Sequence, residues 1–384
     1  MQSYKISLFL IKNDIFVFRH KFQIMNKLVY ILFLLITITF FSCETDIDVN
    51  AEYEDITVVY GLLDPALDTH YIKINKAFLG ATSALELAAD ANNFDYPAGE
   101  LDVIVESSDG TQYYLTRTVN EIPKDPGIFD NSTNVLYRFV EPALSSNLNY
   151  TLKISNSALN KEITAETGIV GDITIDRPQA STSKFNLFSS TGEYLEYKVE
   201  VTTGNDIGRI EAKLFFNYYD IYTLASGLDS VFRSVEITLG DNRTTKTGGG
   251  ESLEWGLKGE IFFEKIVSAV PPMSANLSHR RLDNISLEFL IAGTELSTFM
   301  SVNAPSTSVN QNRPNYTNII NGIGIFSSRS NKTWTSSIDP LTSNQINLSN
   351  GTIEYLATHS SLANRGFCYG YVAQGFPVSP CLRQ

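Results

Sequence analysis

Apolar and polar side chains alternate along much of this chain, and a period of two predicts β-strands. The clearest case is residues 195–201, Leu-Glu-Tyr-Lys-Val-Glu-Val, in which every second residue is apolar. Such a strand buries one face and exposes the other to water. The same pattern continues in residues 209–222, 231–239 and 285–291. We therefore predict that the C-terminal half of the chain is rich in strands.

Shorter strands are predicted in the N-terminal half. Asp109-Gly110 separates two β-favouring runs, and the pair is typical of a hairpin turn that needs a positive φ. Strands are predicted at residues 56–63, 71–76, 101–107, 111–116, 135–140, 150–154, 162–165 and 173–175. Seven or more short strands with frequent turns favour an immunoglobulin-like β-sandwich. We assign this fold to residues 53–176.

A few segments have the composition or spacing of helices instead. Residues 82–91 are rich in helix formers, residues 259–270 have apolar side chains near helical spacing, and residues 295–302 form a weaker candidate. The polar segment 177–183 is the best domain boundary. The chain is thus predicted to be mainly β, with a second β-rich domain over residues 184–384 that carries short helical insertions. In its predicted strand 318–326, Gly322 and Gly324 indicate a bulge or a close backbone approach.

The longest apolar run, residues 28–41, does not indicate a strand or helix of the folded domain. Residues 28–41 follow Lys27 and are almost wholly apolar, and the small Ser42 precedes Cys43. A basic start, a short apolar core and a small residue describe a secretory signal peptide. The run is shorter than the ~20 residues of a membrane-spanning helix. We expect translation to start at Met25, so that residues 1–42 comprise an upstream extension and this signal.

A cysteine directly after the small residue resembles the lipobox of bacterial lipoproteins, in which the thiol is lipidated and becomes the first residue of the mature protein. Residues 43–52 then form an acidic tether. In lipoproteins of Bacteroidota, acidic residues at this place resemble the signal for export to the cell surface. We therefore expect an outer-membrane lipoprotein on the cell surface, with a periplasm-facing protein as the alternative.

The charge of the mature chain narrows the choice of partners. Removing residues 1–42 removes five basic and one acidic side chain from the 29 and 42 of the whole chain, which leaves a net charge of −17. Such a surface repels phosphate backbones and anionic lipid headgroups. We expect no nucleic-acid binding, and we expect membrane contact only through the lipid on Cys43.

The two other cysteines, Cys368 and Cys381, are predicted to form a disulfide, because the envelope is oxidising. Closing this loop would stabilise the fold by roughly 3 kcal/mol in the chain-entropy picture. Two free thiols or a metal pair are the alternative. The three histidines after residue 43, at positions 70, 279 and 359, lie far apart in the sequence and give a metal site little support.

No catalytic motif is visible in the sequence. Gly-x-Ser-x-Gly, His-Glu-x-x-His and Gly-x-x-x-x-Gly-Lys-Ser/Thr are all absent. We therefore predict no catalytic residues, no metal and no cofactor. A hydrolase that uses a pair of carboxylates is a remote alternative. Aromatic side chains could bind a ligand, although most should fill the core; these are Tyr113, Tyr114, Phe215, Phe216, Tyr218, Tyr219, Tyr222, Trp255 and Trp334.

The sequence also contains one candidate site for O-glycosylation. Asp229-Ser230-Val231 matches the short Asp-Ser/Thr-apolar sequence that is used for O-glycosylation in envelope proteins of such bacteria. Ser230 is the acceptor that this match implies.

Several stretches together resemble an uncharacterised family of Bacteroidota lipoproteins, domain of unknown function 4249. They are residues 43–48 after the signal, the strand 56–63, the hairpin around Asp109-Gly110, residues 149–153 and residues 316–326. The region of Gly366 to Tyr369 departs from the Cys-rich ending that is common in the family. Such lipoproteins look like accessories of TonB-dependent outer-membrane transporters.

Taken together, these features predict a lipid-anchored, non-enzymatic envelope protein that acts as a binding or accessory module, plausibly beside a TonB-dependent transporter. A structural or adhesive surface protein without a small ligand is the alternative. The sequence names no ligand.

The lipid anchor gives the first testable prediction. Replacing Cys43 by Ala removes the thiol that would carry the lipid, so lipid labelling should be abolished. The protein should then appear in the soluble envelope fraction, as measured by fractionation and by incorporation of labelled fatty acid. A variant that stays membrane-bound and labelled would show that Cys43 is not the anchor.

Overall fold

A computed structural model describes residues 56–77, 83–127, 130, 132–179, 183–225, 227–304, 315–336 and 347–368. All of these belong to one compact unit that begins at Glu54. Cys43, the tether, the signal segment and Cys381 lie outside the described residues, so the predictions made for them are untested.

The described part of the chain is mainly β, with three sheets and a few short helices. The strands are β1 (Thr57–Leu63), β2 (Thr69–Lys76), β3 (Leu101–Ser107), β4 (Gln112–Tyr114), β5 (Thr116–Val119), β6 (Val135–Val140), β7 (Asn149–Asn156), β8 (Lys161–Gly168), β9 (Thr174–Arg177), β10 (Glu196–Thr202), β11 (Ile207–Leu224), β12 (Gly227–Arg243), β13 (Ser252–Lys258), β14 (Leu277–Gly293), β15 (Gly322–Thr335) and β16 (Phe367–Cys368). The helices are α2 (Ala84–Ala88), α3 (Gly259–Ala269), α4 (Thr294–Asn303) and α5 (Asn350–Thr358), with short 3₁₀ turns at Ala91–Asn93 and Ala363–Arg365.

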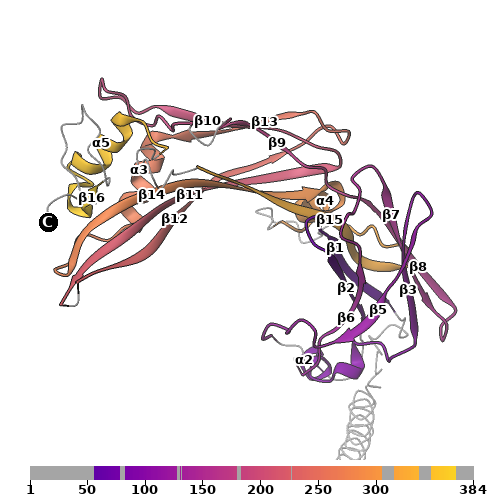
Figure 1. Cartoon of the computed structure of the whole chain (residues 1–384). Helices are drawn as coiled ribbons and strands as arrows, with labels where there is room; N and C mark the ends of the chain where they lie inside the picture. The colour runs from indigo at the N-terminus through magenta and orange to yellow at the C-terminus, as the bar shows by residue number, and fades with distance from the viewer. Residues whose placement is uncertain are drawn as a thin grey trace, which may run out of the picture. The chain divides into compact units, whose positions relative to one another are not determined.

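The largest sheet of the described residues has nine strands and runs through the whole unit (Figure 1). Its order is β12-β11-β14-β15-β1-β2-β6-β5, and β16 pairs with β14 beside this path. A four-stranded sheet has the order β4-β3-β7-β8, and a three-stranded sheet has the order β13-β10-β9.

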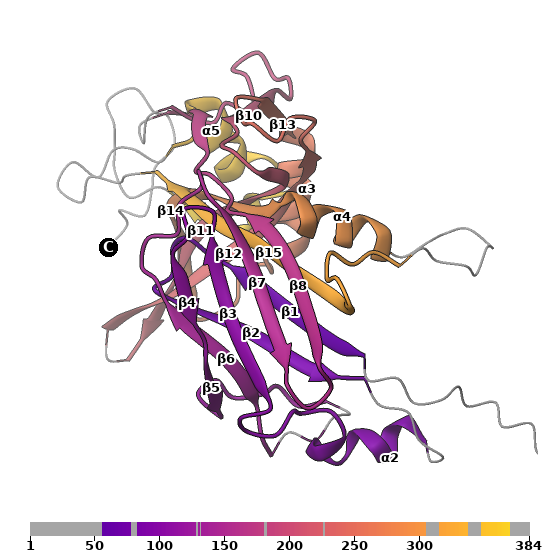
Figure 2. The same cartoon turned by 90° about the vertical axis from the view of Figure 1, so that its right-hand side faces the viewer.

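The first hydrophobic core lies between the four-stranded sheet and the strands around β1, which Figure 2 shows as two layers. Alternation explains it, because β1 and β3 bury every second side chain. Val59 and Ile72 come from one sheet and Val105 and Leu152 from the other, and all are at most 1% exposed. Strands β1 to β8 therefore pack as two layers, whereas β9, the last strand within the predicted sandwich, pairs with β10 in the three-stranded sheet.

The second core lies under the long strands β11 and β14. It is capped by the three-stranded sheet and by helices α3 and α5, since buried side chains of all of these belong to one cluster. Phe216, for example, meets Phe262 of α3 and Phe367 of β16 edge-on, with ring centroids 5.6 Å apart in both pairs. Geometry of this kind is favourable for aromatic pairs.

Strand β15 belongs to both halves of the large sheet. Its first residues, 322–328, pair with β1 in parallel, and residues 329–335 pair with β14 in antiparallel fashion. Phe326 of β15 is fully buried in the first core, where Gly61 leaves room for its ring: a Cβ on Gly61 would lie 2.9 Å from Phe326 Cδ2. The first core therefore includes residues from beyond the predicted boundary at 177–183.

The close backbone approach predicted for the two glycines is confirmed at the start of β15. A Cβ on Gly324 would lie 2.0 Å from the carbonyl oxygen of Val59, and Gly324 has φ of +116°. A side chain would therefore clash with β1 and would also strain the backbone. Glycine at this place is what allows β15 to lie against β1.

Two buried serines lie where β15 changes its partner. The Ser328 hydroxyl accepts a hydrogen bond from the Val170 amide at 3.0 Å, and the Ser327 hydroxyl accepts one from the Leu296 amide at 3.0 Å. Helix α4 has no side-chain cap at its own N-cap, Gly293. Ser327 thus satisfies an amide in the first turn of α4 that its own N-cap leaves open.

Most predicted elements are confirmed, including the hairpin at Gly110 and the helices after residues 258 and 293. Two details were wrong. Residues 318–321 do not extend β15, because Asn318 is hydrogen-bonded to the backbone of Phe326 and Ile320 forms a bridge with β8. The predicted strand 111–116 also divides: β4 pairs with β3, whereas β5 pairs with β6.

The position of Phe326 leads to a stability prediction. Phe326→Ala removes a fully buried ring and should destabilise the fold by about 3–5 kcal/mol in urea unfolding. The same variant should lose hydrogen-exchange protection in β1 and β2. Ile323→Ala, at a 45% exposed position of the same strand, is the control and should change stability by less than about 1 kcal/mol. Equal effects of the two variants would contradict the assignment of Phe326 to the first core.

Candidate functional site

The sequence-predicted site residues lie apart from one another. Cys368 is in β16 and is disulfide-bonded. Its partner lies outside the described residues, so the pairing with Cys381 stays a prediction. Ser230 is exposed in β12, opposite Ile221 of β11. An exposed hydroxyl is accessible to a modifying enzyme, but its glycosylation is untested.

The aromatic pairs divide between core and surface, as the alternation of strand side chains requires. Tyr114 is 70% exposed, whereas Tyr113 packs against the first core. Phe216 and Tyr218 are buried, and their neighbours Phe215 and Tyr219 are only partly so. Trp255 is 4% exposed and donates its indole N–H to the carbonyl of Gly240 at 3.1 Å. Most of these rings therefore fill the core.

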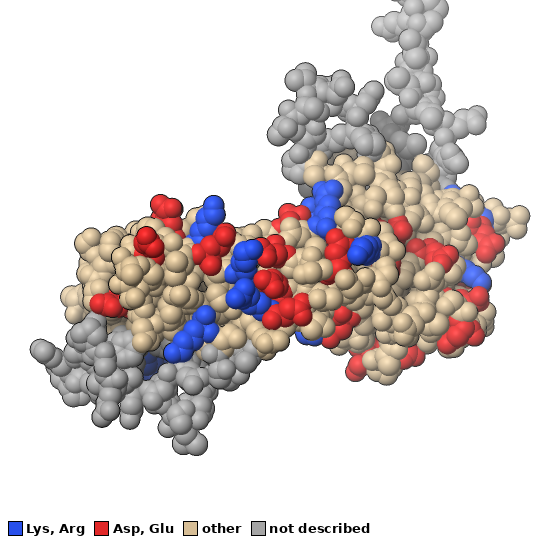
Figure 3. Space-filling model, turned by 90° about the horizontal axis from the view of Figure 1, so that it is seen from above, with Lys and Arg blue, Asp and Glu red and all other residues tan. Residues whose placement is uncertain are grey.

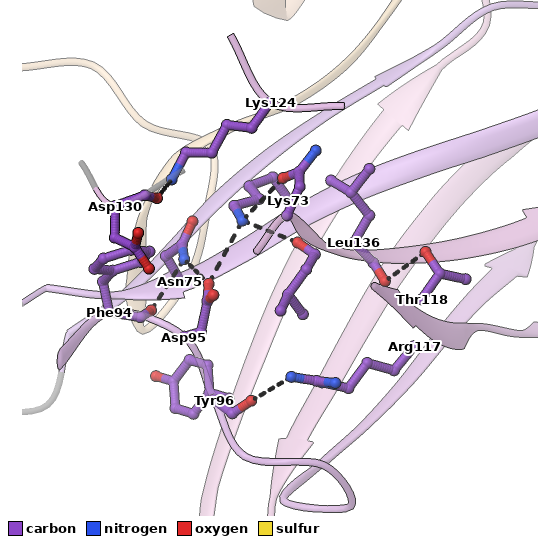
Figure 4. A network of polar contacts seen from close by, with 12 residues as sticks. Lys73, Asn75, Phe94, Asp95, Tyr96, Arg117, Thr118, Lys124, Asp130 and Leu136 are labelled. Carbon is purple, nitrogen blue, oxygen red and sulfur yellow. Dashed lines mark hydrogen bonds and ion pairs between the residues drawn. The ribbon is translucent and has the colours of Figure 1, made fainter. Parts of the chain in front are cut away.

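A partly buried lysine in the first half holds a loop in place (Figure 4). Lys73 of β2 donates to Asp95 at 3.5 Å, to Asn134 at 3.3 Å and to the carbonyl of Val135 at 3.0 Å. Burial lowers the pKa of Lys73, while the charge of Asp95 opposes this shift. Asn75 donates to the same Asp95 oxygen at 2.7 Å. All three ammonium protons have acceptors, so we interpret the cluster as structural.

A second buried cluster joins the distal part of β11 to the C-terminal segment. Asp220 accepts from Arg280 at 2.7 Å and from Arg233 at 3.1 Å, and Arg280 also donates to the carbonyl of Arg365 at 2.6 Å. The side chains of Asp220 and Arg280 are 6% and 2% exposed. A buried pair with further hydrogen bonds positions chain segments, since breaking it would leave an unpaired charge.

The best candidate for a binding site surrounds helix α4. Between Ile207 and Arg209 the register of β11 against β14 shifts, so Gly208 is an extra residue in β11. A Cβ on Gly208 would lie 2.7 Å from Ser297 Cβ and 2.8 Å from Thr294 Cα. Helix α4 thus lies directly on the backbone of β11 at this bulge. Bulges of this kind redirect side chains and are frequent beside functional sites.

Three arginines lie in one row across the sheet beside this helix. Arg243 of β12 is opposite Arg209 of β11, Arg209 is opposite Ala292 of β14, and Ala292 is opposite Arg329 of β15. Directly opposed residues of antiparallel strands share one face of the sheet. Arg209 pairs with Asp241 at 2.7 Å. Within the described residues, Arg243 and Arg329 have no ion-pair partner.

Two cavities lie on the two flanks of α4. One of about 300 Å³ is lined mostly by hydroxyl side chains, such as Thr298 and Ser301 of α4, together with Arg243 and Lys246. The other, of about 380 Å³, has Leu296 and Met300 of α4 on one side and Arg209 and Arg329 on the other. Both volumes fall at the lower end of the range for small-molecule sites.

Two carboxylic acids lie at the N-terminal end of α4. Burial raises the pKa of Asp206, and the hydrogen bond from the Thr294 hydroxyl at 3.4 Å opposes this shift. Burial also raises the pKa of Glu295, and the charge of Asp206 raises it further. Tyr316 donates a hydrogen bond to Glu295. Carboxyl groups with a raised pKa have the property that a general acid needs, although neither of these two lines a cavity at α4.

The face of the molecule drawn in Figure 3 carries mixed charge. Seen from above, basic and acidic side chains lie next to one another (Figure 3). Ion pairs such as Lys198 with Glu254, at 2.6 Å, join opposite charges of neighbouring strands. In the arginine row, by contrast, the ion pairs found among the described residues include only Arg209.

The described residues contain neither a metal-binding cluster nor a membrane-spanning helix. No group of three or more His, Cys, Asp or Glu side chains in these ranges is arranged to hold a metal ion. In the same ranges, no helix has the length and apolar character needed to cross a membrane.

The raised pKa of the half-buried Asp206 leads to a pH-dependent prediction. A raised pKa means that the folded state binds the proton more tightly than the unfolded chain, so ionisation of Asp206 at neutral pH opposes folding. Asp206→Asn should raise the free energy of unfolding at pH 7, and the gain should vanish as the pH falls to about 4. Urea unfolding at the two pH values measures this. Asp102→Asn, on the exposed face of β3, should show no such gain. A gain that persisted at pH 4 would have another cause.

Comparisons with known proteins found distant structural similarity for this chain and no match in sequence. No protein-family model matches it, and no curated protein matches it. Among solved structures, it is similar to the C-terminal globular domain of an oligosaccharyltransferase from Pyrococcus abyssi, at 10% identity and a TM-score of 0.25. The match covers 62% of this chain and 47% of that one, so the chain spans about half the length of that structure. We draw no conclusion about fold or function from a likeness of this size.

Proposed function

We propose that this protein is a lipid-anchored, non-enzymatic module of the bacterial envelope that binds a partner at the outer membrane. The lipid on Cys43 would hold it, the acidic tether 43–52 would carry it to the cell surface, and the two-layered N-terminal part would be an immunoglobulin-like sandwich. The resemblance to Bacteroidota lipoproteins supports a TonB-dependent outer-membrane transporter as the partner.

The observation that carries the proposal is the closed end of the β11–β12 hairpin. Leu228 is 71% exposed, Phe232 is 52% exposed and Leu224 is 45% exposed. Phe232 packs against its cross-strand neighbour Tyr219, with ring centroids 5.5 Å apart, and Arg281 lies over the Tyr219 ring at 5.0 Å. Figure 1 shows this end of the hairpin at the margin of the unit. Large apolar side chains grouped at an exposed end mark a surface for a protein partner.

The same hairpin offers backbone groups to a partner. Strand β12 is the edge of the nine-stranded sheet. Among the described residues, Trp255 and Asn242 form hydrogen bonds between the last part of β12 and β13. An open edge strand can accept a further strand, which provides main-chain hydrogen bonds in addition to apolar contact. A membrane barrel with extracellular loops could supply such a strand.

The test is co-purification from detergent-solubilised membranes. The native protein should bring an outer-membrane barrel with it, and the double variant Leu228→Asp with Phe232→Asp should lose most of that barrel. Because both side chains are exposed, the thermal midpoint should stay within a few degrees of the native value.

The matched control is Leu85→Asp. Leu85 is 61% exposed on α2, far from the hairpin in sequence, and its replacement should leave co-purification unchanged. If the hairpin variant still carries the barrel, or if no barrel travels with the native protein, the proposal is wrong and the structural or adhesive alternative gains support.

One observation favours a second candidate function. Asp206 and Glu295, half-buried at the N-terminal end of α4, have raised pKa values, which is the property that the general acid of a carboxylate-based hydrolase needs. Hydrolysis of a polymer that depended on either residue would favour this function over binding alone.

A further inference from the structure

The cavity of about 380 Å³ beside α4 combines two unlike walls. One wall is apolar, formed by Leu296 and Met300 of α4. The other carries the guanidinium groups of Arg209 and Arg329. A site with an apolar wall and a few fixed polar groups is typical of small-molecule recognition.

The arginine wall is fixed by the sheet. Arg209 and Arg329 lie in the same row on strands two apart, which places their backbones roughly 10 Å from each other. Between them lies Ala292, whose methyl group leaves room for two long side chains to approach one ligand atom. Arg209 is held by Asp241 at 2.7 Å, and Arg329 is exposed without an ion-pair partner in the described ranges.

The acidic residues of the cavity lie one row further along the strands. Glu211 and Asp241 are opposite each other, two residues from the arginine row, which corresponds to roughly 7 Å. Asp241 is neutralised by Arg209, so Glu211 is the acid that a bound anion would meet. Its charge would repel an anionic group from its own row and direct that group toward Arg329.

The apolar wall is unusual in being open to solvent. Met300 is 42% exposed although it lies on a helix that packs against three strands. Its flexible thioether side chain adapts to ligands of different shape. A ligand that covered Met300 would bury apolar surface that the protein alone leaves in contact with water.

We propose that this cavity binds a small amphipathic anion, with its acidic group between Arg209 and Arg329 and its apolar part against Leu296 and Met300. The inference rests on the proposed function, since it gives the binding module a ligand class. It does not involve the hairpin, so either can fail without the other.

The test uses two probes of equal shape and different charge, 4-phenylbutyrate and the neutral 4-phenylbutanamide. Each is titrated into the purified full-length chain in detergent, with a titration into detergent alone subtracted. The anion should bind saturably and about tenfold more tightly than the amide, because hydrogen bonds to a charged group are the stronger ones.

Variants separate the two walls. Arg329→Gln should remove most of the tenfold preference for the anion and leave the amide unchanged. Met300→Gln should weaken both probes by a similar factor. Glu211→Gln should tighten binding of the anion alone. Arg177→Gln, at an exposed arginine of β9 that pairs with Glu200, is the control and should change neither.

Two results would overturn the proposal. One is equal affinity of the two probes for the native protein. The other is an anion preference that survives Arg329→Gln, which would place the anion elsewhere. If the anion does not bind but a barrel still co-purifies, the proposed function stands and only the ligand proposal fails. If the anion binds but no barrel co-purifies, the ligand proposal stands and the proposed function fails.

Discussion

The pairing of one strand with two different neighbours is the constraint on which the structure depends. The first half of β15 completes the sheet of the first core, and its second half lies beside β14 in the second. Gly324 makes this possible, since a side chain there would meet the backbone of Val59. The buried hydroxyls of Ser327 and Ser328 then satisfy amides of α4 and of the segment that leads into the second half. Fold and candidate site are thus held by the same few residues.

Local patterns were sufficient to predict most strands and helices. The alternation in residues 195–201 and the Asp109-Gly110 turn are signals within a few residues, and both gave the observed elements. Pairing between distant strands has no such signal. Nothing near Ile56 indicates that β1 has a parallel neighbour more than 250 residues later in the chain. The glycines of β15 predicted a close approach, but not the strand that approaches.

The candidate site around α4 could not be predicted from the sequence either, because it depends on pairing between distant strands. Arg209, Arg243 and Arg329 come from three strands, and each is an ordinary polar residue in its own segment. Only the register of four strands places them in one row. Helix α4 was predicted, yet its position depends on the bulge at Gly208 and on Ser327, which caps it from another strand. By contrast, the prediction for Cys43 rests on a local sequence pattern and needs no fold, and it stays a prediction because Cys43 lies outside the described residues.

The late position of β15 has a consequence for how the protein is made. A chain that is delivered from its N-terminus presents β1 and the layers around it long before β15 exists. Until then one side of β1 has open hydrogen-bonding groups, and the place of Phe326 in the first core is empty. Such an intermediate is exposed to wrong strand pairing. The first core can be completed only after β15, which comes late in the chain, has been delivered.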